Sequence, residues 1–224
     1  MGCGSAYFAT VLASDFAGED VEYTGIDMSK DAILAARRFL RKRDRAIIGS
    51  VTAMPFADGE FDDVLYLDVI EHVADDRASL KEAFRVLKPR GRLIVSTPNN
   101  EAWLTDTFFC EYMHDHGHME NQRAGYSAKE LGGMLQDVGF SVEKVDYSNV
   151  LFSEFLITLT KLGYRLYKPR YASQADVIEV SQSSLFWIHK NIVFPIGYCI
   201  GKLEEWLLKP ALNGHCLIEL ARKP

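Results

Sequence analysis

The sequence has 224 residues, of which 48% are hydrophobic and 25% charged, and its formal net charge is -6. Nucleic-acid-binding proteins are usually basic, so this acidic balance argues against a nucleic-acid partner. The length and apolar content are typical of one domain with an elaboration. No run of about 20 uninterrupted apolar residues occurs, so no membrane-spanning helix is expected. The start carries no basic, apolar leader pattern, so we expect a cytoplasmic protein.

Apolar strand-like runs alternate with helical patterns up to about residue 150. The expected strands are Val21–Met28, Ala46–Val51, Asp63–Val69, Arg92–Thr97 and Phe140–Tyr147. The expected helices are Ser5–Phe16, Lys30–Arg43, Asp76–Leu87 (closed by Pro89 and Gly91) and Ala128–Val138. This βαβα alternation indicates an α/β fold with a mostly parallel sheet, and it places the loops after the strands at one sheet edge.

The alternation stops at residue 151. Residues 151–212 combine a helical apolar pattern, a polar connector and the aromatic stretch 185–208, and Cys216–Ala221 then reads as a last core strand. We therefore expect a core of residues 1–150 and 213–224, with 151–212 as a helical insertion before the last strand. The insertion would contact the substrate, a membrane surface or a second copy of the chain, or pack on the sheet.

The four cysteines lie far apart, and no C-x-x-C pair occurs among them. This spacing is typical of reduced, buried thiols in a cytosolic protein rather than of a disulfide framework or a zinc site. The four residues are Cys3, Cys110, Cys199 and Cys216.

Four sequence features follow one another in a fixed order. They are the turn GCGS (2–5), an aspartate at a strand end (Asp27), the segment GSVTAMPFADGEFD (49–62), and LDVIEHV (67–73) followed by RVLKPRGRLIVSTPN (85–99). Together they resemble the class I S-adenosylmethionine-dependent methyltransferases, in particular the type 11 group that includes the ubiquinone-biosynthesis O-methyltransferases. The resemblance covers roughly residues 1–148 and resumes at 215–222. It implies a Rossmann-like three-layer sandwich.

The resemblance also implies a set of residues that bind S-adenosyl-L-methionine. The glycine turn would line the methionine half, Asp27 would accept hydrogen bonds from the ribose diol with Met28 beside the adenine, and Ser50 and Val51 would meet the adenine amino group. Leu67 and Asp68 would border the transferred methyl group. The expected cofactor-binding residues are Gly2, Cys3, Gly4, Asp27, Met28, Ser50, Val51, Leu67 and Asp68.

Histidines are the expected proton acceptors. His72 is the first choice as base for an oxygen acceptor, and His116 or His118 is the second. Alternatively, Glu71 and His72 only cap and shape their loop. The cluster HDHGH (114–118) lacks a second ligand pair, so we expect lid or acceptor contacts and no metal site. In a lid, Arg123 and Tyr126 would close over the cofactor together with these histidines.

Substrate specificity is expected to come from segments outside the shared core. The aromatic, lysine-containing stretch 185–208 could lie against a membrane surface and admit a lipophilic acceptor such as a quinone or lipid. A basic run is expected either to be a solvated helix face or to attract anionic lipid headgroups. It comprises Arg37, Arg38, Arg41, Lys42, Arg43 and Arg45. The sequence leaves the oligomeric state open.

The glycine turn stands at the start of the chain, whereas such turns follow a buried strand. In the family the first strand reads approximately VLDxGCG, so Met1 would stand where relatives carry an internal strand residue. We therefore expect an N-terminally truncated sheet that lacks the family's first strand.

Two other functions stay open at this point. One is a non-catalytic or partial methyltransferase-like protein whose insertion serves interaction. The other is an NAD-dependent oxidoreductase, which is disfavoured because the Gly2-x-Gly4 turn lacks the third glycine at position 7. Binding of S-adenosylhomocysteine or NAD would separate the three.

Overall fold

The structure is a computed structural model that describes residues 2–3, 21–37, 40–102, 123–148, 199, 202–203, 206–207 and 213–224. The predicted helix Ser5–Phe16 and nearly all of the predicted insertion 151–212 lie outside the described residues. None of the helices described is long and apolar enough to cross a membrane.

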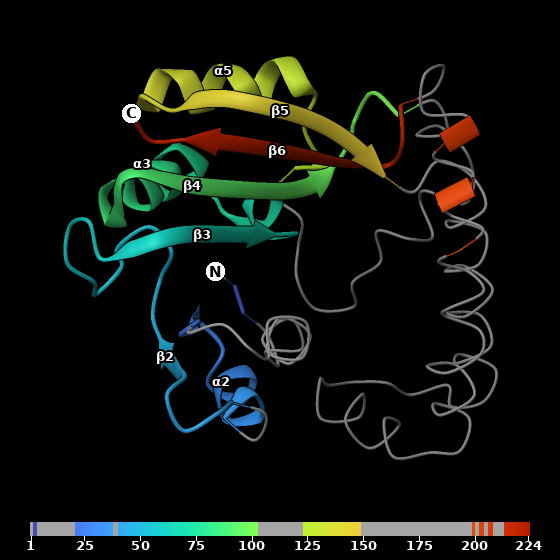
Figure 1. Cartoon of the computed structure of the whole chain (residues 1–224). Coiled ribbons are helices and arrows are strands. Elements are labelled where there is room, and N and C mark those ends of the chain that lie inside the picture. The colour runs from blue at the N-terminus through green and yellow to red at the C-terminus, as the bar shows by residue number, and fades with distance from the viewer. Residues whose placement is uncertain are drawn as a thin grey trace, which may run out of the picture.

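A four-stranded sheet makes up the larger part of the fold. Its strands are β3 (Phe61–Leu67), β4 (Leu87–Pro98), β5 (Ser141–Ser148) and β6 (Cys216–Arg222), in the order β3-β4-β6-β5. β3 and β4 are parallel, whereas β6 runs antiparallel to both β4 and β5. The last strand of the chain thus inserts between two earlier ones (Figure 1). The predicted parallel α/β sheet is confirmed, with β6 as the reversed strand.

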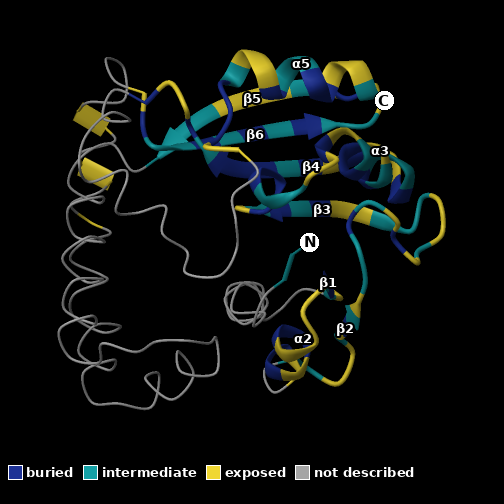
Figure 2. Ribbon diagram, turned by 180° about the vertical axis from the view of Figure 1, so that it is seen from behind, coloured by how far each residue is buried: buried dark blue, intermediate teal, exposed yellow. Residues whose placement is uncertain are grey.

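Two helices pack against one face of this sheet. α3 (Asp76–Val86) is capped by Asp75, and α5 (Ala128–Val138) begins with a capping box between Ser127 and Glu130. α3 packs on β4, and α5 packs on β5 and β6. Figure 2 shows the buried residues concentrated in β4, β6 and α3, so the main core lies between the sheet and these helices.

A smaller unit precedes this sheet in the chain. β1 (Thr24–Asp27) pairs in parallel with β2 (Arg45–Ile48), and α2 (Lys30–Ala36) joins them after its N-cap, Ser29. Among the described strands, β1 and β2 form a separate two-stranded sheet. Residues 2–3 lie next to β1, where the Cys3 N–H donates to the Ile26 carbonyl at 3.0 Å. The expectation of an absent first strand stays a prediction.

The two predicted helices nearest the functional loops differ from the expected bounds. α2 ends at Ala36 rather than Arg43, and the described residues 40–44 form a turn in which the Asp44 carboxylate accepts the Arg41 N–H at 3.0 Å. α3 ends at Val86, and β4 begins directly at Leu87. Pro89 and Gly91 do not separate helix from strand, because they lie inside β4 where its pairing with β3 is irregular.

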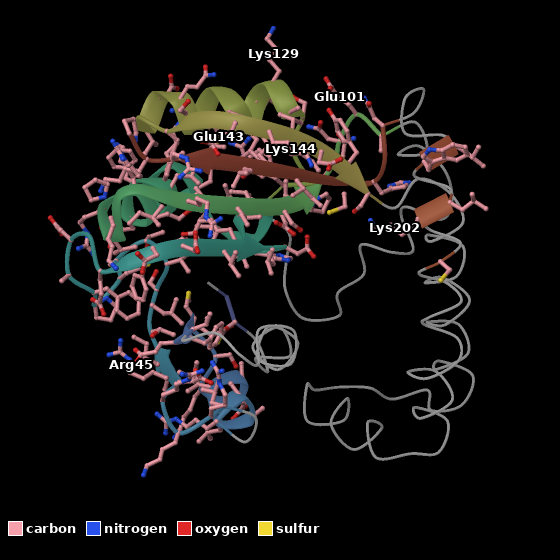
Figure 3. The ribbon with its side chains drawn as sticks, viewed as in Figure 1. Arg45, Glu101, Lys129, Glu143, Lys144 and Lys202 are labelled. Carbon is pink, nitrogen blue, oxygen red and sulfur yellow. The ribbon has the colours of Figure 1, made fainter. Side chains whose placement is uncertain are left out.

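The strands alternate between the helix-covered face and the other face of the sheet. In β6, Leu217, Glu219 and Ala221 are buried, whereas the residues between them are only half-buried. Charged pairs link the strands at their solvent side, with the Arg222 guanidinium bound to Glu143 of β5. Figure 3 labels Glu143 and Lys144 on β5.

Candidate functional site

The carboxyl ends of β1 and β3 are brought together by the first residues of the chain. Cys3 is hydrogen-bonded to Ile26 of β1, and Gly2 lies against Val69, two residues after β3. A Cβ atom on Gly2 would come within 2.5 Å of the Val69 Cγ2 atom, and Gly2 has a φ of 58°. Only glycine fits this position without strain, so the turn connects the two strand ends at close range.

Asp27 is the last residue of β1, as the resemblance implied. Its Oδ1 atom accepts the Ser29 N–H at 2.9 Å, which fixes the carboxylate at the start of α2. Two apolar side chains beside it face solvent: Met28 is 75% exposed, and Ile48, paired with Asp27 across the sheet, is 54% exposed. A hydrogen-bond acceptor flanked by apolar surface suits a ribose diol with an attached aromatic base.

The Cys3 side chain packs on β1 and has a structural role. Burial raises the pKa of its thiol to about 11, with the Asp27 carboxylate adding to the rise, so the group is protonated at neutral pH. A Cβ atom on Gly25 would meet the Cys3 sulfur at 2.8 Å, so the side chain packs on β1. Cys199, in contrast to the expected burial, is exposed.

Ser50 and Val51 follow β2, and the structure limits what each can offer. The Ser50 hydroxyl accepts the Thr52 N–H at 3.2 Å and lies 2.8 Å from the Thr52 hydroxyl. The Val51 side chain is buried in the main core. The Ser50 hydroxyl could therefore bind a ligand at this loop while it keeps its hydrogen bonds to Thr52. Val51 could contribute only its main-chain groups.

Two residues of α3 hold the loop after β2. The Glu82 carboxylate accepts the Met54 N–H at 2.7 Å, and the Arg85 guanidinium donates to the Met54 carbonyl at 3.0 Å and to the Phe56 carbonyl at 2.8 Å. Glu82 and Arg85 also bind each other. The Glu82–Arg85 pair thus binds both main-chain polar groups of Met54, in the loop that begins at Ser50.

The turn after β3 carries two carboxylates. Leu67 ends the strand, and Asp68 has a φ of 52°, a left-handed conformation that Asp tolerates better than most residues. Glu71 is 2% exposed, and burial together with the nearby Asp68 charge raises its pKa to about 7. Glu71 lies in η1 (Ile70–His72), a single turn at the sheet edge.

His72 is next to Glu71 in this turn. Its Nε2 atom is 3.9 Å from the Glu71 Oε1 atom. Burial lowers the pKa of the imidazole from its ordinary value, although the Asp68 charge opposes this. The ring is therefore neutral at neutral pH, the state that a general base requires.

The predicted lid is wrong for Tyr126. This side chain is fully buried, and its hydroxyl donates to the Asp76 carboxylate at 2.9 Å behind η1. Arg123 stacks over the Tyr126 ring and lies 3.3 Å from Asp76. Buried aromatic and acidic groups here fix the chain between β4 and α5, while His116 and His118 lie outside the described residues.

The described residues 41–45 of the predicted basic run do not lie on a helix. Arg41 binds the Asp44 carboxylate at 2.8 Å and the Val21 carbonyl at 2.8 Å, and Arg45 lies 3.4 Å from Glu60. The helix-face interpretation is wrong for residues 41–45, because they lie outside α2 in the turn before β2 and at its first residue. Among the described residues, no group of His, Cys, Asp or Glu is arranged to hold a metal ion.

Two hydroxyl residues near the end of β4 also belong to this region and were not predicted from the sequence. Ser96 donates to Asp68 at 2.8 Å, and Thr97 donates to Glu71 at 3.2 Å. A Ser-Thr pair ending a strand beside the LDVIEHV turn was the available signal, because parallel neighbours end at the same sheet edge.

Comparisons with known proteins identify the family of the chain. A family model described as "Methyltransferase domain" matches residues 1–147. A demethylmenaquinone methyltransferase of Listeria welshimeri is 28% identical over 160 residues, covering 62% of this chain and 67% of the relative. A ubiquinone biosynthesis O-methyltransferase of Alkalilimnicola ehrlichii is 34% identical over 119 residues, covering 50% and 47%. The chain thus spans about half to two thirds of these relatives.

Solved structures show the same fold. A SAM-dependent methyltransferase of Thermotoga maritima has a TM-score of 0.57 at 19% identity, covering 100% of this chain and 80% of that one. One from Archaeoglobus fulgidus has a TM-score of 0.57 at 16% identity, covering 99% and 83%.

The described residues suit the cofactor of this family, S-adenosyl-L-methionine. Gly2 packs directly on Val69, which brings the ends of β1 and β3 together, and Asp27 presents a carboxylate between exposed apolar groups. The family match also removes the NAD-dependent oxidoreductase from consideration. The chain therefore belongs to the class I S-adenosylmethionine-dependent methyltransferase family.

Proposed function

We propose that the chain transfers a methyl group from S-adenosylmethionine to a small, lipophilic acceptor that resembles a quinol. The observation that carries the proposal is the close approach of two strand ends, Asp27 after β1 and the Asp68–His72 turn after β3, through Gly2 and Cys3. The names of the demethylmenaquinone and ubiquinone methyltransferase relatives support a quinone-like acceptor.

The residues after β1 and β2 would hold the donor. Asp27 accepts hydrogen bonds from the ribose hydroxyls, and Met28 and Ile48 supply apolar contacts to the base. The Ser50 hydroxyl and the main chain of Val51 meet the polar edge of the adenine. When bound, the cofactor supplies a methyl group activated by its positively charged sulfur. The sulfur becomes a neutral thioether when the methyl group is transferred.

The residues after β3 would prepare the acceptor. The fixed strand ends align the acceptor oxygen with the methyl carbon, and such alignment can contribute ~7–11 kcal/mol to catalysis. His72 takes the acceptor proton as the new oxygen–carbon bond forms, because its imidazole is neutral and stands beside the Glu71 carboxyl. His116 and His118 remain the second choice for this role.

Titration calorimetry with S-adenosylhomocysteine tests the donor site. Wild type should bind in the micromolar range, and Asp27→Asn should bind about tenfold or more weakly, because it loses charge-assisted hydrogen bonds. Asp137→Asn is the control, since Asp137 is an exposed residue of α5 that pairs with Arg77 of α3. No binding by the wild type would favour a non-catalytic relative, and unchanged binding by Asp27→Asn would remove Asp27 from the site.

Methyl transfer from labelled donor to a water-soluble quinol analogue tests the base. His72→Gln should keep the affinity for S-adenosylhomocysteine within about twofold and lower kcat by about 100-fold or more, as expected for loss of a general base. Transfer at the wild-type rate would exclude His72 from the proton-transfer step.

A second proposal concerns the stretch 185–208, which we infer lies on a membrane surface to reach its acceptor. Leu203, Trp206 and Leu207 each have a helical backbone and are 56%, 75% and 57% exposed. Their spacing of three and four residues gathers them on one helix side. Sedimentation with vesicles of anionic lipid should carry the wild type down, whereas the triple change to Ser should leave it in solution. Equal sedimentation of both proteins would exclude this surface.

A further inference from the structure

Two hydroxyl residues stand side by side at the end of β4. Ser96 and Thr97 are consecutive, so their side chains project to opposite faces of the sheet. Both are buried: Ser96 is 9% exposed and Thr97 is fully buried. The strand does not need either hydroxyl group, because β4 pairs with β3 and β6 through main-chain hydrogen bonds.

Ser96 binds Asp68 twice. Its carbonyl accepts the Asp68 N–H at 2.9 Å, and its hydroxyl donates to the Asp68 Oδ1 atom at 2.8 Å. Asp68 has a left-handed backbone with a φ of 52°. The two bonds hold this left-handed conformation, which residues other than glycine rarely adopt. The Asp68 carboxylate is thereby fixed at the strand end.

Thr97 binds the second carboxyl of the same turn. Its hydroxyl donates to the Glu71 Oε2 atom at 3.2 Å, in a contact where both groups are buried. The other oxygen of this carboxyl, Oε1, is the atom 3.9 Å from the His72 Nε2 atom. Thr97 therefore holds one oxygen of Glu71 while the other faces the imidazole.

The two carboxyl groups repel each other when both are ionised, since they lie three residues apart in one turn. Their hydrogen-bond donors come from the two faces of β4, so each group is fixed in a different direction. A rigid arrangement of this kind keeps catalytic groups at the geometry that the reaction needs.

We propose that the Ser96–Thr97 hydroxyl pair is a positioning device with two separate tasks. Ser96 orients Asp68 toward the methyl donor, and Thr97 orients Glu71 beside His72, so that the base has a carboxylate to stabilise its protonated form. The inference rests on the proposed methyl transfer and deepens it. On this inference, Ser96 supports donor binding and the adjacent Thr97 supports proton removal.

The proposal predicts how the reaction depends on pH. Proton removal needs Glu71 ionised, and the Thr97 hydrogen bond favours that form, so its loss raises the pKa of Glu71 further. The other titratable groups that face Glu71 come from the same turn, from the segment before α5 and from β6. They are Asp68, His72, Tyr126 and Cys216.

Thr97→Val tests the second task, with Thr97→Ser as the matched control that keeps the hydroxyl. In Thr97→Val the acid limb of the kcat profile should move to higher pH by roughly 0.5–1 unit, with the donor KM unchanged. Carbon-13 NMR of labelled glutamate should show the same shift in the Glu71 titration without any turnover. Thr97→Ser should behave as wild type. If neither readout moves, Thr97 is only a packing residue.

Ser96→Ala tests the first task. The Kd for S-adenosylhomocysteine should rise about tenfold, the loss expected for one charge-assisted hydrogen bond, while the acid limb of kcat stays in place. Cys216→Ala is the control, because it removes the sulfur that lies 3.6 Å from the Ser96 hydroxyl and leaves the hydrogen bond from Ser96 to Asp68 in place. A Kd that stays at the wild-type value in Ser96→Ala, or rises equally in Cys216→Ala, would overturn this task.

The outcomes separate this inference from the proposed function. If wild type fails to bind S-adenosylhomocysteine, the proposed function fails before any variant is compared. If wild type binds and transfers methyl groups, but the two variants show the same changes in KM and pH profile, the inference alone fails. Should Thr97→Val not fold, as judged by circular dichroism, Thr97→Ala supplies the same comparison.

Discussion

Glu219 places a carboxyl group in the core between β6 and α5. It is fully buried, and neither oxygen accepts a hydrogen bond from the part of the chain described. Gly132 of α5 lies directly above it, since a Cβ there would be 3.5 Å from the Oε2 atom. Burial raises its pKa from 4.5 to about 7. The folded protein thus binds a proton here that the unfolded chain releases near its ordinary pKa.

This carboxyl makes the protein less stable as the pH rises. Its protonated form is favoured in the fold, so the stabilising contribution is complete below pH 4.5 and is lost as the pH approaches 7. Glu219→Gln stays neutral, so its Tm should fall less between pH 5 and pH 8, by several degrees at about 2–4 °C per kcal/mol. Glu71 has a raised pKa as well, so the slope should flatten rather than vanish.

Thermal unfolding followed by circular dichroism measures this difference. Glu143→Gln is the control, because the Arg222 guanidinium lowers the pKa of Glu143 and its contribution changes only at lower pH. An identical Tm slope in Glu219→Gln and wild type would show that Glu219 is ionised in the folded protein at pH 5.

Single residues differ in how well the sequence predicted them. Asp27 and Gly2 were predictable because a strand-end acid and a side-chain-free turn are local patterns, and both stand where expected. Tyr126 and Thr97 were not, because their partners Asp76 and Glu71 are 50 and 26 residues away in the chain. Only the fold brings such groups together.

At the level of elements, α3 connects the loop after β2 to the main core. Arg85 donates to the Met54 and Phe56 carbonyls and to Asp58, and Glu82 accepts the Met54 N–H. The loop has little secondary structure of its own, so these bonds fix its backbone. The helix therefore determines where Ser50 and Val51 stand.

Arg85→Ala should loosen this loop without disturbing the sheet. We expect a loss of about 1–3 kcal/mol in urea unfolding, since two carbonyls lose charged donors, and several-fold weaker binding of S-adenosylhomocysteine. Arg77→Ala on the same helix removes only an exposed pair with Asp137 and should cost less than about 1 kcal/mol. Equal losses of stability in the two variants would show that the Arg85 contacts with the loop do not stabilise the fold more than an exposed ion pair does.

Element boundaries were predicted best where caps are local. Ser127 and Gly139 enclose α5 at the predicted residues, because a capping box and a left-handed glycine act over a few positions. The ends of α2 and β4 were wrong because longer-range contacts decide them. Asp44 accepts backbone N–H groups from both Tyr23 and Arg41, and Leu87 pairs with Phe61 across the sheet.

On the scale of the whole molecule, the described strands form two sheets that differ in how many strands and helices pack against them. β4 is paired on both sides, by β3 and β6, and lies under α3. β1 is paired with β2 alone among the described strands, and its local cluster is small, with Ile33, Ala36 and Ala46 at its centre. The proposed donor site takes residues from both units, since Asp27 belongs to one and Asp68 to the other.

This unequal support should appear in hydrogen exchange of the free protein. Amides of β1 and β2 should exchange through local opening, well before those of β4 and β6, because fewer buried contacts and one fewer strand partner protect them. If S-adenosylhomocysteine binds residues of both units, as proposed, adding it should slow exchange most in β1 and in the loop after β2. Mass spectrometry of peptides from the two sheets measures this directly. Equal exchange rates without ligand, or ligand protection confined to the larger sheet, would mean that the donor is not held by Asp27 and Asp68 together.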